Sequence, residues 1–164
     1  MTQQPATPRA DVSLEDYFGN GRSLREFAGG VAVVVYAERH GATAALRLGQ
    51  TLHARFGPVA GQPVVHVIPV ACLLEVPRMF HGLARNLLRR QSPDVVVWID
   101  FHGTLQRVVG LRPNLANVAV IDPQGRLGGA HAGDFDQQLV EAVVADVDRC
   151  RRGAEITPCP HSSG

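Results

Sequence analysis

The chain has 164 residues, of which 45% are hydrophobic and 19% are charged, and its formal net charge is +1. This composition is typical of one soluble globular domain, and the near-neutral charge gives no reason to expect a nucleic-acid or membrane partner. All sixteen basic residues are arginine, which excludes every site that depends on a lysine, such as a Schiff base or a P-loop.

The first nine residues are polar and proline-rich, without the apolar core of a signal peptide, and no stretch approaches the roughly 20 apolar residues of a membrane span. We therefore expect a cytoplasmic protein, although a trimmed secreted form would have the same sequence. The three cysteines, Cys72, Cys150 and Cys159, are widely spaced and odd in number. This indicates a reducing compartment rather than a disulfide framework. A disulfide between Cys150 and Cys159 is an alternative that the sequence does not decide.

We expect a flexible lead over residues 1–11, a single domain over 12–152 and a flexible tail over 153–164. Early in the domain, Ser23 and Glu26 have the spacing of a capping box, which predicts a short helix ending at the glycine pair 29–30. Residues 31–35 (VAVVV) are apolar throughout, as in a central strand covered on both faces. An amphipathic helix over residues 43–56 and a second strand over residues 63–70 should follow.

The next helix should begin at Pro77, a residue suited to the first helical position. Its apolar residues are expected to form a buried stripe, namely Met79, Phe80, Leu83, Ala84, Leu87 and Leu88. Its arginines, Arg78, Arg85, Arg89 and Arg90, are expected on the solvated side. Such a row of arginines usually faces water, and contact with an acidic partner is the alternative.

The last third of the chain predicts a strand over residues 95–99, a turn over 100–103, and a hairpin around the type I turn at 122–125 (DPQG). Asp134, with Gln137 three residues on, predicts the start of a terminal helix. One face of this helix carries Phe135, Leu139, Val143 and Val147. The expected fold class is α/β, a mixed central sheet flanked by helices that closes with a β-hairpin and a helix.

Two segments resemble a known family. Residues 12–37 are similar to the opening of alkyl-hydroperoxide-reductase and TlpA-type thioredoxin-like proteins, where a short strand, a G-x-x-x-x-L turn and a glycine corner precede the first core strand. The DFHG turn at 100–103 and the IDPQGR segment at 121–126 resemble the second half of that family and are closest to its YtfJ-type branch. The resemblance spans residues 12–149 and implies a thioredoxin-like fold.

The chain departs from this family at both redox positions. Alignment of the valine strand places His40-Gly41-Ala42-Thr43 on the C-x-x-C motif, and Ala116 stands where the family keeps a cis-proline, with Pro113 three residues too early. The proline-threonine-cysteine run of peroxiredoxins is absent as well. Because a thiolate is the nucleophile in this chemistry, we expect a non-catalytic module that binds a protein or small ligand at the former active-site edge. The sequence does not decide whether the chain is an enzyme, but the missing cysteines favour a protein that is not one.

The corner after the valine strand is the first candidate site. Glu38, Arg39, His40 and Thr43 lie beside an expected helix N-terminus, where an anion is favourably bound. His102, in the turn after a neighbouring strand, joins them as a candidate ligand-binding residue. The alternative is a solvated corner in which Thr43 serves as a helix N-cap.

Cys72 is the alternative, catalytic candidate. It follows the second strand, and the carboxyl ends of parallel neighbours meet at one sheet edge, so Cys72 and Glu75 could lie near His40. A Cys72 thiol with His40 as its orienting base would give a thiol-dependent oxidoreductase or peroxidase of displaced chemistry. The opposing interpretation is a buried, inert cysteine that packs as a small hydrophobe.

The histidines do not predict a metal site. His40, His102 and His131 are expected in turns and His66 in a strand, without the pairing at i, i+3 or i, i+4 that metal sites use. We therefore expect neither a metal nor another cofactor. A homodimer stays open and would be indicated by an exposed apolar patch.

Overall fold

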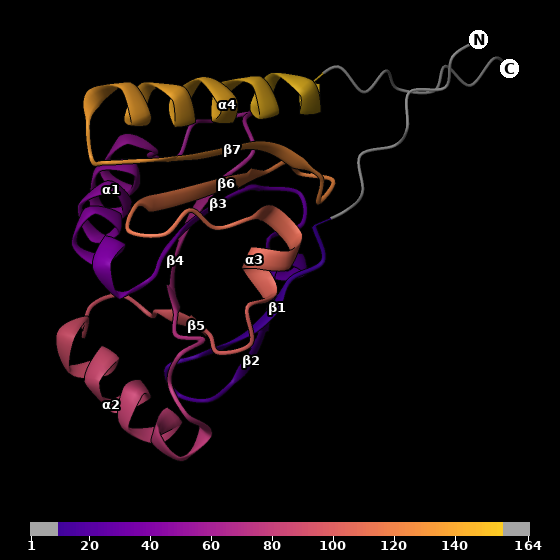
Figure 1. Ribbon diagram of the computed structural model, residues 1–164. Coiled ribbons are helices and arrows are strands. Elements are labelled where there is room, and N and C mark those ends of the chain that lie inside the picture. Colours follow the sequence, from indigo (N-terminus) through magenta and orange to yellow (C-terminus); the bar gives the residue numbers. More distant parts are fainter. Residues whose placement is uncertain (1–9, 156–164) are drawn as a thin grey trace, which may run out of the picture.

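A seven-stranded mixed sheet organises residues 10–155, the part of the chain that the computed structural model describes (Figure 1). Its strands are β1 (Ser13–Asp16), β2 (Gly21–Ser23), β3 (Val31–Ala37), β4 (Val65–Cys72), β5 (Trp98–Asp100), β6 (Ala116–Ile121) and β7 (Leu127–Gly133). They lie in the order β2-β1-β5-β4-β3-β6-β7. The three inner strands β3, β4 and β5 are parallel, and the strands outside them pair antiparallel.

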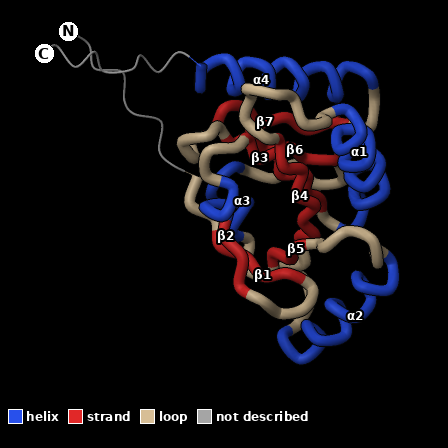
Figure 2. The backbone as a smooth tube through the Cα atoms, turned by 180° about the vertical axis from the view of Figure 1, so that it is seen from behind, coloured by secondary structure: helices blue, strands red, loops and turns tan. Residues whose placement is uncertain are grey.

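Four α-helices flank this sheet: α1 (Ala42–Arg55), α2 (His81–Gln91), α3 (Thr104–Val109) and α4 (Gln137–Glu155). Short 3-10 turns cover Leu24–Phe27, Arg39–Gly41 and Arg78–Phe80. Helices α1, α2 and α4 lie on one side of the sheet and α3 lies on the other (Figure 2). The predicted α/β class, with its mixed sheet, closing hairpin and terminal helix, is confirmed.

Strand β3 is the centre of the molecule, as its apolar run predicts. All seven of its residues are buried. Alternate side chains point to opposite faces, so Ala32, Val34 and Tyr36 join the cluster that includes Leu105 of α3. Val31, Val33 and Val35 pack instead with α1 and α4, whose apolar residues Leu48, Leu52, Leu139, Val143 and Val147 close that side. The sheet is therefore covered on both faces.

Two local predictions from polar residues are confirmed. Ser23 and Glu26 form the capping box, in which the Ser23 hydroxyl accepts from the Arg25 N–H and the Glu26 carboxylate accepts from the Ser23 N–H at 2.9 Å. The hairpin turn is held by Asp122, whose carboxylate accepts from the Gln124 and Arg126 N–H groups. Both motifs act within a few residues of chain, which is why the sequence alone reveals them.

The terminal helix starts later than predicted. Its first turn is capped by Asp136, whose carboxylate accepts from the Leu139 N–H at 2.8 Å, and not by Asp134. Phe135 accordingly lies outside the helix and is exposed, while Leu139 is buried. His131 also differs from its prediction, because it lies within β7 rather than in a turn.

The prediction for α2 is confirmed for only part of its apolar stripe. Ala84 and Leu88 are half-buried and pack against the cluster of Ile99 and Phe101, whereas Met79, Phe80, Leu83 and Leu87 are exposed. Arg85 turns toward the sheet instead, where its guanidinium donates to both oxygens of Glu15 at 2.8 and 3.0 Å. This ion pair joins residues 70 positions apart, so no pattern within the helix reveals it.

The strand before the second turn is shorter than predicted. Only Trp98–Asp100 form β5, and Val95 and Val96 lie exposed before it.

At the start of the described chain, the Ala10 N–H donates to the Gly125 carbonyl at 2.8 Å. Of the helices within residues 10–155, none combines the length and the hydrophobicity needed to cross a bilayer. Cys159 and most of the predicted lead and tail lie outside the described residues.

Candidate functional site

The carboxyl ends of the three parallel strands meet at one edge of the sheet, as the sequence predicts. Ala37 of β3 pairs in register with Ala71 of β4, and Cys72 pairs with Asp100 of β5. The segments that follow these strands therefore leave the sheet side by side. This edge carries the corner at 38–43, Cys72 and the turn at 100–103.

The corner at 38–43 is a 3-10 turn that leads directly into α1. Arg39, His40 and Thr43 are exposed and Glu38 is half-buried. Thr43 is not the N-cap: α1 begins at Ala42, its N-cap is Gly41, and no side chain caps it. The prediction of a Thr43 cap is therefore wrong, because the preceding turn Arg39–Gly41 already continues into the helix.

Gly41 is the tightest point of this corner. A Cβ built on it would lie 2.8 Å from the carbonyl carbon of Leu115 and closer still to its oxygen. The loop before β6 thus packs directly on the start of α1. The corner is therefore in contact with the segment just before Ala116, and neither residues 38–43 nor residues 115–117 contain a cysteine or a proline.

Cys72 is poorly suited to thiolate chemistry. Burial raises the pKa of its thiol to about 12, and the nearby carboxylates of Asp100 and Glu38 add to the rise. Within residues 10–155, Cys72 forms no hydrogen bond with His40 or His102, and both described cysteines, Cys72 and Cys150, are free thiols. At neutral pH the Cys72 thiol is therefore protonated, which removes its nucleophilic form.

Asp100 organises the second turn of this edge. Its buried carboxylate accepts hydrogen bonds from the backbone N–H groups of His102, Thr104 and Leu105, at 3.1, 3.0 and 2.8 Å. Gly103 supplies the left-handed φ of 71° that the turn requires. Asp100 thus stabilises the start of α3, and His102 is exposed in the turn before it.

His102 lines a cavity of about 520 Å³ together with Glu15, Arg78, His81 and Arg85. None of the corner residues 38–43 borders this cavity. The His81 ring stacks on Phe101 at 3.6 Å between ring centroids, which fixes its position beside the arginines. His102 thus lines a cavity that the corner residues do not border, although the sequence groups it with His40.

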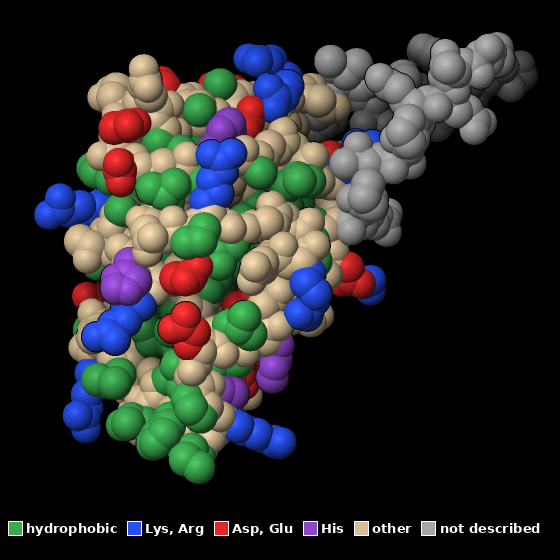
Figure 3. Space-filling view, in the orientation of Figure 1, with side chains coloured by type: hydrophobic (Ala, Val, Ile, Leu, Met, Phe, Trp, Pro, Cys, Tyr) green, Lys and Arg blue, Asp and Glu red, His purple; other side chains and the backbone are tan. Residues whose placement is uncertain are grey.

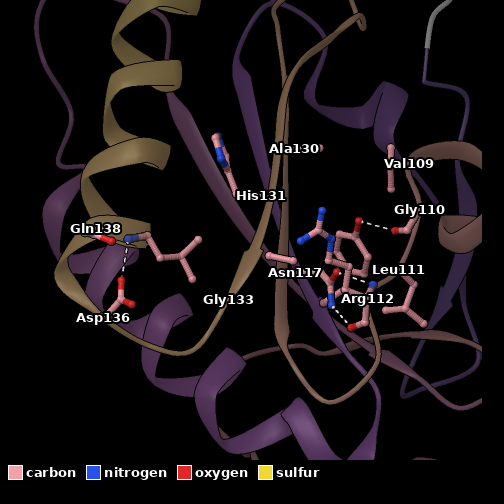
Figure 4. Close-up of a pocket in the computed structure, with 13 residues that line it drawn as sticks. Val109, Gly110, Leu111, Arg112, Asn117, Ala130, His131, Gly133, Asp136 and Gln138 are labelled. Carbon is pink, nitrogen blue, oxygen red and sulfur yellow. Dashed lines mark hydrogen bonds between the residues drawn. The ribbon is translucent and has the colours of Figure 1, made fainter.

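A second cavity, of about 590 Å³, lies at the carboxyl end of β3 on the side of β6 and β7 (Figure 4). The Tyr36 hydroxyl borders it and donates to the Gly110 carbonyl at 2.7 Å. Asn117 accepts from the Arg112 N–H at 2.8 Å and donates to the Arg112 and Leu115 carbonyls at 3.0 Å. Asn117 therefore anchors the loop that closes one side of the cavity and that also touches Gly41.

The walls of this cavity carry a positively charged side chain, Arg112, and a negatively charged one, Asp136. Figure 4 shows Gly110, Arg112 and Asn117 on one side, and Asp136 and Gln138 at the start of α4 on the other. Arg112 is exposed, and its guanidinium forms no ion pair or hydrogen bond within the described residues. His131, also on the wall, is bound to the carboxylate of Asp146 on α4. Arg112 is thus the cationic group best placed to meet a ligand.

Sequence reasoning overlooks Arg112 and Asn117. The only local signal is a single amide in the apolar strand Ala116–Ile121, since a buried amide needs hydrogen-bond partners. Among residues 10–155, no group of three or more His, Cys, Asp or Glu side chains has the arrangement of a metal site.

No family model matches the chain, and no curated protein matches its sequence. Solved structures do match. The exposed lipoprotein thioredoxin of Streptococcus pneumoniae strain TIGR4 is 18% identical, with a TM-score of 0.63 over 85% of this chain and 98% of that one. A DsbF homologue from Corynebacterium diphtheriae is 14% identical, with a TM-score of 0.57 over 84% of this chain and 85% of that one.

A third match is BsSco, a member of the Sco family of cytochrome c oxidase assembly proteins in which a disulfide switch has been identified. It is 11% identical, with a TM-score of 0.55 over 91% of this chain and 96% of that one. At these identities the likeness shows the fold alone. The chain has the thioredoxin-like fold that the sequence predicts.

Proposed function

We propose that this chain is a non-catalytic thioredoxin-like protein that binds a protein segment or small ligand at the carboxyl edge of β3. One observation carries the proposal: the corner after β3 has no cysteine, and the nearby Cys72 thiol has its pKa raised to about 12. The same edge keeps a cavity of about 590 Å³, so a binding surface remains where thiolate chemistry is disfavoured.

The candidate contacts follow from the walls of that cavity. Arg112 supplies an unpaired cation, and the exposed Arg39 and His40 lie on the corner that packs against the same loop. A ligand with a carboxylate or similar anionic group is favoured at Arg112. We further propose that the chain is a cytoplasmic member of the alkyl-hydroperoxide-reductase and TlpA-like group that has lost its redox cysteines.

An NMR titration tests the binding proposal. Isotope-labelled protein would be titrated with a defined set of acidic and neutral tripeptides and small organic acids. We expect shifts in the amide signals of Tyr36, Arg112, Asn117 and residues 38–43, and an approximately tenfold weaker affinity in Arg112→Ala, worth about 1.4 kcal/mol. Arg55→Ala, an exposed arginine at the end of α1, is the matched control and should bind normally.

Two outcomes would contradict the proposal. One is a set of shifts confined to other surfaces and unaffected by Arg112→Ala. The other is thiol chemistry, measured as insulin reduction or peroxide consumption, that is lost in Cys72→Ser. That second result would support the alternative enzyme with displaced chemistry at Cys72.

A further inference from the structure

The cavity of about 520 Å³ at the α2 end of the sheet is lined mainly by basic side chains. Its walls carry Arg78, His81, Arg85 and His102, with Glu15 of β1 as the acidic member. Figure 3 shows histidine and arginine side chains on the surface at this end of the molecule, beside the hydrophobic side chains over α2. The cavity shares no lining residue with the 590 Å³ cavity at β6 and β7, so the two are separate sites.

The acidic residue of this cavity is already engaged by Arg85. Both carboxylate oxygens of Glu15 accept from Nη2 of Arg85, at 2.8 and 3.0 Å. Within residues 10–155, Nη2 is the only nitrogen of Arg85 with a protein partner, because Nε is buried without one and Nη1 forms no hydrogen bond. Buried polar atoms normally have a partner. Glu15 therefore orients the guanidinium and leaves part of its donor capacity unused.

His81 is held so that one ring nitrogen is left for a ligand. Its ring stacks on Phe101 with the centroids 3.6 Å apart, and its Nε2 donates to the Val76 carbonyl at 3.1 Å. A carbonyl can only accept, so Nε2 carries a proton. Nδ1 has no hydrogen-bond partner in the described part of the chain. It can accept from a protonated oxygen or, when the ring is charged, donate to an anionic one.

Arg78 and His102 bring two more polar groups from other segments. Arg78 lies in the 3-10 turn before α2 and His102 in the turn after β5, and both are exposed. The backbone of His102 is fixed, since its N–H donates to Asp100 at 3.1 Å and its carbonyl accepts from Nη1 of Arg107 at 2.7 Å. Among residues 10–155, neither the Arg78 guanidinium nor the His102 ring forms an ion pair or hydrogen bond. Both side chains are available to a ligand.

We propose that this cavity binds the phosphate group of a small ligand, either inorganic phosphate or a phosphate monoester. The basic groups come from three segments, and a tetrahedral phosphate offers oxygens in more directions than the two of a planar carboxylate. The arginine fork matches the spacing of two phosphate oxygens. The volume of about 520 Å³ is in the range of small-molecule sites.

A metal ion fits this cavity less well. Two histidines and a glutamate are possible ligands by type, but both oxygens of Glu15 accept from Arg85. In the part of the chain that the structure describes, no three His, Cys, Asp or Glu side chains have the arrangement of a metal site. The neighbouring arginines would also repel a cation. The charges on the walls therefore favour an anion.

An NMR titration of the full chain with sodium phosphate, at constant pH and ionic strength, tests the proposal. The ring signals of His81 and His102 should shift and saturate, whereas the ring of His53, exposed on α1, should not respond. Sodium acetate and sodium malonate should bind at least about tenfold more weakly than phosphate, because they lack the tetrahedral group.

Two arginine variants of equal charge provide the matched comparison. Arg78→Gln should weaken phosphate binding about tenfold, through loss of one charge-assisted contact. Arg90→Gln removes the same charge from an exposed position at the end of α2, outside the cavity, and should bind normally. His102→Gln should weaken binding about threefold, as for a weaker contact. Circular dichroism checks that the three variants are folded.

The same titration separates the two sources of the phosphate group. Equal affinities for inorganic phosphate, glycerol 3-phosphate and phenyl phosphate would identify phosphate itself as the ligand. An affinity at least about tenfold higher for a monoester would identify a phosphorylated small molecule, since its organic part then contributes to binding.

Three results would overturn the proposal. The first is the lack of a saturable shift at His81 and His102 with up to about 20 mM phosphate. The second is equal weakening by Arg90→Gln and Arg78→Gln, which would show a general attraction to the charge of α2. The third is binding of acetate or malonate as tight as that of phosphate. None of them bears on the site at Arg112, which all the variants retain.

Discussion

At the scale of single residues, the surroundings of a side chain decide which chemistry is open to it. Cys72 lies at an edge where the parallel strands bring polar groups together, yet its thiol is desolvated and faces the carboxylates of Asp100 and Glu38. Each of these factors penalises the thiolate. Arg112 is in the opposite situation, since its guanidinium is exposed and has no partner among the described residues.

The raised pKa of Cys72 predicts slow alkylation. At pH 8 the folded protein should react with iodoacetamide at Cys72 at least about 100-fold more slowly than the urea-unfolded chain, because the fraction of thiolate falls about tenfold for each unit by which the pKa exceeds the ordinary value of 9.0. Peptide-resolved mass spectrometry separates Cys72 from Cys150 and Cys159. Equal rates in the folded and unfolded protein would contradict the burial of this thiol.

At the scale of elements, the start of α1 depends on close packing with the loop before β6. Gly41 lies against the Leu115 carbonyl, and Asn117 holds that loop through three hydrogen bonds. A side chain at position 41 would push apart the two segments that border the proposed binding edge. Gly49, in the middle of the same helix, has open space around it.

This contrast predicts opposite effects of one substitution. Gly41→Ala should lower the free energy of unfolding by about 1–3 kcal/mol, because the added Cβ overlaps a backbone carbonyl. Gly49→Ala should raise it by about 0.5–1 kcal/mol, because alanine favours the helix and meets nothing there. Urea unfolding of both variants measures the difference, and a neutral or stabilising Gly41→Ala would refute the close contact.

For the whole molecule, the buried acidic groups make stability depend on pH in the alkaline range. Burial raises the pKa of Tyr36, with a further contribution from Cys72, and burial likewise raises the pKa of Cys150, with a contribution from Asp122. The chain has no lysine, so lysine titration does not obscure this range. Above pH 9 the unfolded chain releases protons that the folded chain retains, and stability therefore falls as pH rises.

Cys72 should account for a measurable part of this dependence. The pKa of Cys72 rises from 9.0 in the unfolded chain to about 12 in the folded protein. This difference should lower the free energy of unfolding by on the order of 2–4 kcal/mol between pH 8 and pH 12. Cys72→Ala should flatten the profile whatever its effect at pH 8, so the slope is the quantity to compare. Urea unfolding at intervals from pH 8 to pH 11 measures it, and parallel profiles for the two proteins would contradict the prediction.

The fold was largely predictable because its signals are local. The valine run of β3, the capping box at Ser23 and Glu26, and the turn held by Asp122 each depend on neighbouring residues. The candidate site was predictable only in its location. The sequence places His40, Cys72 and His102 at one edge, but among residues 10–155 no hydrogen bond joins either ring to the thiol, and the cavity wall contributed by Arg112 and Asn117 is missed.

By itself, the sequence determines the α/β order of elements, the absence of cysteine at the corner after β3 and the absence of lysine anywhere in the chain. Only the tertiary structure decides which face of α2 is exposed, how strongly the Cys72 thiol resists ionisation and where a cavity lies. The physical reason is that these properties arise between distant segments. Arg85 meets Glu15 across 70 positions, and Cys72 meets Asp100 across neighbouring strands.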